Sequence, residues 1–237
     1  MEPKLGPPLR ATQYVESILV SAILDGTYPA GTPLPGERAM AGLIGVTRPT
    51  LRETLQRLAS EGWVKIQHGK PTVVNDYWLE GGLRMIGTLA KYAKFLPNGF
   101  ITKLLEVRVT LLPPVARLAA LHHPQKLIEY LSRHPEPADS ETTYATYDWE
   151  LQMQITRLSG NPVYALIFND FASMFMKMAI HYFRSEMSRH TSLQYYSDLS
   201  KAVAHNADTV EEVVRFAMQK SIEIWHEVKG PNASLHL

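Results

Sequence analysis

Three long polar side chains recur at every fourth position in one stretch of the chain: Arg48, Arg52 and Gln56. If this stretch is helical they share one face, because residues four apart are neighbours on a helix. Arginine can donate two hydrogen bonds to O6 and N7 of guanine, which provides roughly 1–3 kcal/mol of base discrimination. The same spacing is also typical of a solvated helix face, so on its own it leaves DNA binding and a plain polar surface both open.

The neighbouring residues predict where this helix begins and ends. Thr47 can cap its N-terminus, Pro49 is tolerated in the first turn, and Gly62 is a typical stop after the last turn. A second face of the helix is apolar and should pack on a core. The members of that face are Leu51, Leu55, Leu58 and Ala59.

Positive charge is concentrated around the same helix. The whole chain has 24 Lys and Arg against 23 Asp and Glu, a formal net charge of +1. Residues 47–70 hold five basic and two acidic side chains. Attraction to an acidic partner must therefore come from this local cluster rather than from the overall charge.

The flanking segments predict a winged helix-turn-helix domain. In chain order they are an amphipathic helix from near Leu9 to Gly26, a proline-rich extended connector at 28–35, a short helix at about 36–43, and, after Gly62, two strands at 63–67 and 72–75. In such a domain the third helix enters the major groove of DNA, and the tip of the hairpin contacts the backbone or the minor groove.

The rest of the chain predicts an all-α domain of long helices, with no strand signal. We expect Pro113 and Pro114 to kink or divide one of these helices, because each removes a backbone donor. The protein should therefore be mainly α, with a winged helix-turn-helix at 1–77 and a helical bundle at 78–237. The expected helices are at about 79–94, 98–122, 124–133, 141–158, 162–185, 188–206 and 209–229.

The composition is typical of a globular, cytoplasmic protein. Hydrophobic residues make up 45% of the 237 residues, enough for a real core, and cysteine is absent, which excludes disulfides and thiolate metal sites. No run approaches the ~18–20 apolar residues that span a bilayer, so no membrane partner is expected. No nucleophile–base pair, phosphate loop or paired-carboxylate motif is present, and we do not expect an enzyme. A helical domain that is an enzyme or a pure interaction module is the remaining alternative from another class.

Several motifs in the first 75 residues resemble the N-terminal signature of the GntR family of transcription regulators. They are PAGTPLPGER at 29–38, GVTRPTLRE at 45–53 and LASEGW at 58–63. The resemblance implies DNA contacts from Arg38, Thr47, Arg48, Thr50, Arg52, His68 and Gly69. The chemistry is compatible, since threonines and free helix amides suit phosphates and a glycine lets a wing tip approach a narrow groove.

Further runs resemble the acyl-CoA-responsive branch of that family, which regulates fatty acid metabolism. They are IQHGKPT at 66–72, LLEVR at 104–108, SGNPVY at 159–164, HYF at 181–183 and SIEIWH at 221–226. The resemblance implies a homodimer on a near-palindromic operator of double-stranded DNA, released when long-chain acyl-CoA binds the helical domain. It places the ligand on Arg108, Tyr182, Ser221 and Trp225, although Met218 and Lys220 depart from the pattern of the branch.

Other members of the family often carry a metal held by an Asp with a His four residues later. Here Asp148 is followed at that position by Gln152, whose amide is a poor ligand for transition metals. We therefore expect no metal and no cofactor, and only the acyl-CoA effector. A GntR regulator that responds to a small carboxylate or another metabolite is the alternative within the family.

Overall fold

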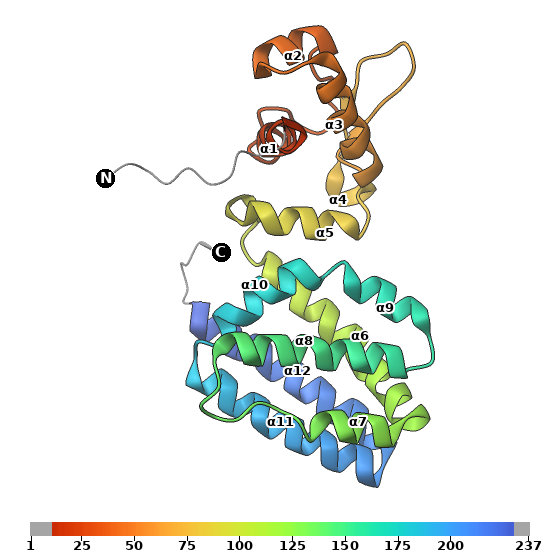
Figure 1. Cartoon of the computed structure of the whole chain (residues 1–237), viewed down its shortest axis with the longest axis vertical. Coiled ribbons are helices and arrows are strands. Elements are labelled where there is room, and N and C mark those ends of the chain that lie inside the picture. The colour runs from red at the N-terminus through yellow and green to blue at the C-terminus, as the bar shows by residue number, and fades with distance from the viewer. Residues whose placement is uncertain (1–10, 230–237) are drawn as a thin grey trace, which may run out of the picture. The chain divides into compact units, whose positions relative to one another are not determined.

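The computed structural model describes residues 11–229, and the chain divides into two compact units between Thr88 and Leu89. Among the described residues the fold is mainly helical with one two-stranded sheet, as the sequence predicts (Figure 1). The predicted start of the first helix near Leu9 lies outside the described residues.

The first unit has the order of a winged helix-turn-helix. Its elements are α1 (Ala11–Leu24), α2 (Glu37–Ile44), α3 (Arg48–Glu61), β1 (Val64–Lys65) and β2 (Val73–Val74). The strands are antiparallel and shorter than predicted, with Val64 opposite Val74. The proline-rich connector lies on the other edge of β2, where Gly31 N donates to Val74 O at 2.8 Å. Strand β2 is therefore hydrogen-bonded on both edges, and the segment 66–72 that joins the two strands forms the wing.

The ends of α3 follow the local signals in the sequence. Thr47 is the N-cap, and its Oγ1 accepts a hydrogen bond from Thr50 N at 3.3 Å. Gly62 ends the helix in the left-handed conformation with a φ of 92°, which favours glycine. A Cβ at this position would also lie 3.0 Å from the Cα of Gly81, so a larger residue fits poorly.

The core of the first unit forms on the apolar face of α3. Leu51, Leu55 and Leu58 are buried, while Arg48, Arg52 and Gln56 on the other face are exposed. The predicted division into a packing face and a cationic face is therefore confirmed. The other large buried side chains of this core are Val15, Leu19, Ile23, Leu34, Met40, Trp63 and Val74.

The prediction of one helix at 79–94 is wrong. The structure has three short elements in its place, α4 (Tyr77–Glu80), α5 (Arg84–Leu89) and a 3-10 helix, η1 (Ala90–Phe95). Gly81 is extended, and a Cβ there would lie 2.4 Å from the carbonyl oxygen of Tyr77. The Gly81-Gly82 pair therefore ends α4 where the apolar pattern alone suggested continuation.

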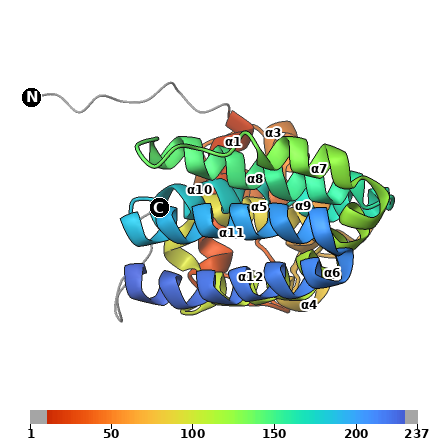
Figure 2. The ribbon, with the colours of Figure 1, turned by 90° about the horizontal axis from the view of Figure 1, so that it is seen from below.

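The second unit is a bundle of seven helices within the described residues. They are α6 (Phe100–His122), α7 (Pro124–Leu131), α8 (Glu141–Leu158), α9 (Pro162–Asn169), α10 (Ala172–Tyr182), α11 (Glu186–His205) and α12 (Ala207–Lys229). Figure 2 shows α12 beside α6 and α11, and α8 lies against α6 and α10. The core between them includes Leu112 and Val115 of α6, Leu151 of α8 and Val214 of α12.

The two prolines of α6 do not divide it, contrary to one of the two outcomes we expected. Helix α6 runs without interruption from Phe100 to His122. Pro113 has no amide hydrogen, so the carbonyl of Val109 loses its usual helical donor. Arg215 of α12 supplies a donor instead, with its Nη1 at 3.5 Å from that oxygen.

The prediction of one helix at 162–185 is also wrong, because the chain breaks between α9 and α10. The two helices are bent by 68°. Asn169 and Asp170 stand at the break, and their short polar side chains compete with helical backbone bonding. Within residues 11–229 no single helix is long and apolar enough to cross a membrane; only α9 and α10 taken together reach that length and composition.

Candidate DNA-binding surface and ligand pocket

An open, concave surface lies between α2, α3 and the wing. Five of the seven residues assigned to DNA contact line it: Arg38, Arg48, Arg52, His68 and Gly69. Their side chains, and the backbone of Gly69, are exposed to solvent. The fold therefore brings together residues that are up to 31 positions apart in the sequence (38 to 69) on one cationic surface.

The other two assigned residues stand at the N-terminus of α3. The hydroxyl groups of Thr47 and Thr50 are 2.9 Å apart and hydrogen-bonded to each other. Free amide groups at a helix N-terminus attract anions, and threonine hydroxyls add donors. This end of α3 is therefore chemically suited to a phosphate of the DNA backbone.

Arg52 is held by a carboxylate that the sequence did not single out. Its Nη2 lies 2.7 Å from Oε2 of Glu37 on α2, and its Nε donates to the same carboxylate. The hydrogen bond from Arg52 lowers the pKa of Glu37 below its usual value. Glu37 therefore stays ionised and fixes the direction of one guanidinium on the cationic surface.

The wing tip is exposed and has the glycine that its backbone requires. Gly69 has a φ of 69°, in the left-handed region, and no atom stands within 4 Å of where a Cβ would be. The backbone conformation rather than crowding therefore favours glycine here. His68 precedes it on the exposed tip.

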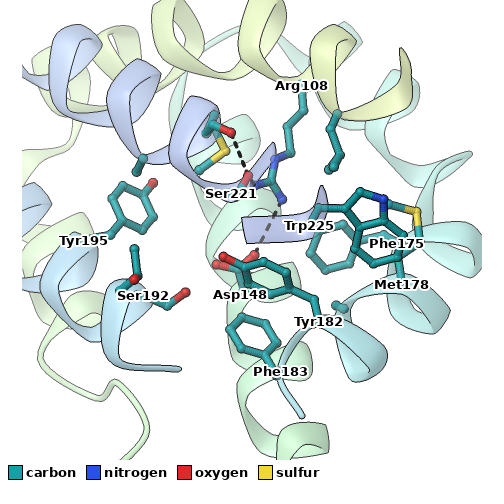
Figure 3. Close-up of a pocket in the computed structure, with 15 residues that line it drawn as sticks. Arg108, Asp148, Phe175, Met178, Tyr182, Phe183, Ser192, Tyr195, Ser221 and Trp225 are labelled. Carbon is teal, nitrogen blue, oxygen red and sulfur yellow. Dashed lines mark hydrogen bonds and ion pairs between the residues drawn. The ribbon is translucent and has the colours of Figure 1, made fainter. Parts of the chain in front are cut away.

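A pocket in the helical unit is lined by all four residues assigned to the ligand, Arg108, Tyr182, Ser221 and Trp225 (Figure 3). The space among these residues that no atom occupies is about 580 Å³, counting the part that is open solvent. The four residues come from α6, α10 and α12, and residues of α8 and α11 complete the wall. Much of the remaining lining is apolar, including Leu105, Phe175, Met178, Phe183 and Met218.

Arg108 is the cation of this pocket. Its Nη2 donates to Oγ of Ser221 at 3.0 Å, and its Nη1 lies 3.9 Å from Oδ2 of Asp148, the ion pair that a dashed line marks in Figure 3. The guanidinium also lies 5.9 Å from the centre of the Phe175 ring. Nε of Arg108 is buried and has no hydrogen-bond partner among the described residues.

Asp148 is buried behind Arg108 and accepts hydrogen bonds on both carboxyl oxygens. Tyr196 donates to Oδ1 at 3.2 Å and the amide of Gln152 donates to Oδ2 at 3.1 Å. Burial raises the pKa of Asp148 above its usual value, while Arg108, Tyr196 and Gln152 act in the opposite direction. Gln152 thus serves as a donor to Asp148 at the position where a metal-binding relative would have a histidine.

Tyr182 of α10 and Trp225 of α12 both line the apolar part of the pocket. Burial raises the pKa of Tyr182 to about 12, so its phenol is neutral. Trp225 is only 2% exposed, and its ring lies 5.8 Å from that of His181. Ser221 and Trp225 are four residues apart on α12 and share one face.

A second, more apolar pocket adjoins the first. It encloses about 470 Å³, part of it open to solvent, and shares Leu105, Arg108, Phe175 and Met178 with the first. Trp149 lies beside Phe175 in its wall, with ring centres 5.1 Å apart. Phe168 and Phe171 reach this pocket from the break between α9 and α10.

Comparison with known proteins matches both units. A family model described as bacterial regulatory proteins, gntR family, matches residues 11–74, and one described as FadR C-terminal domain matches residues 75–234. The fatty acid metabolism regulator proteins of Escherichia coli strain K12 / DH10B and of Shigella boydii serotype 18 are each 39% identical over 217 residues. The match covers 91% of this chain and 91% of each relative. The chain belongs to the GntR family.

This GntR regulator shares its fold with a more distant solved structure. That structure, described as Lar, which controls the expression of the Listeria monocytogenes agr system, has a TM-score of 0.56 at 15% identity. The match covers 94% of this chain and 99% of that chain. The GntR protein described here is therefore a DNA-binding transcription regulator with a FadR-type helical domain.

The residues of this GntR regulator that sequence reasoning missed are partners of the assigned ones. Glu37 holds Arg52, Asp148 stands beside Arg108, and Phe175 covers the Arg108 guanidinium. The sequence alone indicates Asp148 only as a possible metal ligand. Within residues 11–229 no group of three or more His, Asp and Glu is placed to hold a metal ion.

Proposed function

We propose that this GntR regulator binds a near-palindromic operator as a homodimer in the cytoplasm, controls genes of fatty acid metabolism, and leaves the operator when long-chain acyl-CoA occupies the helical unit. Arg48 and Arg52 read base edges in the major groove, Thr47 and Thr50 hold phosphates, and His68 and Gly69 contact the DNA at the wing. Arg38 adds a further contact from α2. The helical unit has a sensing role and no catalytic one.

The observation that carries the ligand assignment is the shared pocket. Four residues from three helices, assigned to the ligand by the sequence resemblance, line one cavity, and much of its remaining lining is apolar. Arg108 and Ser221 offer donors to a phosphate, thioester or pantetheine, and the aliphatic and aromatic lining suits a lipid tail. The names of the relatives, fatty acid metabolism regulator proteins, point to the same class of ligand.

Hydrophobic burial is large enough to make such a pocket sensitive to chain length. Each buried CH₂ contributes about 0.8 kcal/mol, so two carbons change affinity by about 1.6 kcal/mol, or about fifteenfold. To release DNA the ligand must also bind one arrangement of the protein better than the other. A difference of about 5.5 kcal/mol moves a population from 1:99 to 99:1.

The test begins with a footprint on genomic fragments, which should yield a protected site with two related half-sites. Mobility-shift titration of that site with palmitoyl-CoA should then release the protein, while free CoA and acetate should not, at one fixed salt concentration. Release by acetate or another small carboxylate instead would overturn the acyl-CoA assignment and favour the other branches of the family.

A further inference from the structure

The charge of the ligand pocket is balanced by its own residues. Arg108 and Asp148 are the only charged side chains among the described residues that line it. They lie 3.9 Å apart, Nη1 to Oδ2, and their side chains are 14% and 11% exposed. A ligand head that enters the pocket therefore meets a cation that is already paired.

The hydrogen bonds around Asp148 favour its ionised form. Oδ1 accepts from the hydroxyl of Tyr196, and Oδ2 accepts from the amide of Gln152. Donors to both oxygens stabilise a carboxylate over a carboxylic acid. Asp148 thus supplies a negative charge at the polar end of an otherwise apolar cavity.

An anionic head and an uncharged head meet this arrangement differently. A free carboxylate that approaches Arg108 also approaches Asp148, and like charges repel more strongly in a pocket than in water. An uncharged acyl carbonyl can accept from the guanidinium without that repulsion. Nε of Arg108 is in addition a buried donor without a hydrogen-bond partner among residues 11–229.

We propose that Asp148 is the specificity-determining residue by which the pocket rejects free carboxylates and accepts uncharged acyl heads of the same chain length. The proposal rests on the function proposed above and names the chemical class that the site selects. The sensor then responds to activated acyl groups and ignores the free acids from which they are made.

The first test uses the unaltered protein and three ligands with the same chain, below their aggregation concentrations. Calorimetry should show that palmitoyl-CoA binds, and that hexadecanol, which has an uncharged head and no CoA, binds about tenfold or more tightly than palmitate. Equal binding of hexadecanol and palmitate overturns the role of Asp148 even if palmitoyl-CoA binds. Failure of palmitoyl-CoA to bind overturns the proposed function.

The second test removes the charge with little change of shape. In Asp148→Asn the preference for hexadecanol over palmitate should shrink by about tenfold, while Asp148→Glu, which keeps the charge, should retain it. Asp208→Asn is the matched control, because Asp208 loses the same charge on an exposed ion pair with Arg117. Operator affinity without ligand and the melting temperature report whether each variant is folded. An unchanged preference in a folded Asp148→Asn protein contradicts the proposal; if that variant does not fold, the unaltered protein decides.

Discussion

Arg52 on the third helix is tied to Glu37 on the second, with Nη2 and Oε2 2.7 Å apart. The pair orients a guanidinium on the surface where DNA is expected, and it places one negative charge among the cations. Its Arg52 side chain is 59% exposed, so the pair organises the surface rather than stabilising the fold. If Arg52 reads bases as proposed, the direction of its guanidinium depends on Glu37, which carries a negative charge.

Glu37→Gln should lower the preference for the operator over random DNA. Without the carboxylate Arg52 is less constrained, while the surface becomes more positive, so binding to random DNA should rise. We expect the preference to fall by about 1 kcal/mol, or about fivefold. Fluorescence anisotropy with operator and scrambled duplexes over a series of salt concentrations measures the affinity for the operator and the affinity for random DNA. An unchanged ratio would mean that Glu37 does not orient a base-reading side chain.

Trp225→Ala should weaken ligand binding alone, and Arg48→Ala should weaken operator binding alone. Loss of the Trp225 ring should weaken acyl-CoA binding by about 2 kcal/mol and leave operator affinity without ligand intact. Arg48→Ala should weaken operator binding by about 1–3 kcal/mol and leave the ligand affinity intact. Phe216→Ala, on the same helix as Trp225 but 71% exposed, is the control that should change neither. Loss of both activities in either variant would indicate misfolding or a wrong site.

Arg215→Met should destabilise the helical unit, because Arg215 contacts the Val109 carbonyl that Pro113 leaves without a helical donor. The Val109 carbonyl, which Pro113 leaves without its helical donor, would lose the contact from Arg215. We expect the free energy of unfolding to fall by about 1 kcal/mol, measured by urea denaturation. Lys220→Met, which breaks an exposed pair with Glu223 on the same helix, should cause no measurable change. Equal effects of the two variants would show that the Val109 contact contributes nothing.

Stability should depend on pH through Asp148. Burial raises its pKa in the folded protein above the usual value of 3.8, so above that value the unfolded chain releases the proton first. The free energy of unfolding therefore falls as the pH rises through the interval between the two pKa values. Asp148→Asn lacks this proton, so the stability of the variant relative to wild type should rise as the pH rises above 3.8 and level off once Asp148 is ionised in both the folded and the unfolded protein. Urea denaturation at each pH measures the difference, and a constant or falling difference would contradict the raised pKa.

The parts of the fold that the sequence predicts well depend on neighbouring residues. Thr47, Pro49 and Gly62 mark the ends of α3 within a span of sixteen residues, and the structure has them as cap, first turn and stop. The apolar spacing of α1 and of α3 likewise predicts that these two helices form. Residues of this kind act on the adjacent one or two helical turns, so their effect does not depend on the rest of the chain.

The parts that could not be predicted depend on residues far apart in the chain. The Val109 carbonyl, which Pro113 leaves without a helical donor, is met by Arg215, which lies 106 positions later in the chain. The carboxylate of Asp148 accepts a hydrogen bond from Tyr196, 48 positions later, and pairs with Arg108, 40 positions earlier. The resemblance to a family supplied the residues assigned to the ligand, but not the partners, such as Asp148, that lie against them.

The most direct test of the account is release of the operator by acyl-CoA thioesters of increasing chain length. Anisotropy of a labelled operator duplex gives the concentration at which half of the protein is released, at constant salt. Between octanoyl-CoA and palmitoyl-CoA this concentration should fall steeply, by up to about fifteenfold for each two carbons until the pocket is filled. A half-release concentration that does not change with chain length, or no release at all, would contradict the claim that the helical unit senses a buried acyl chain.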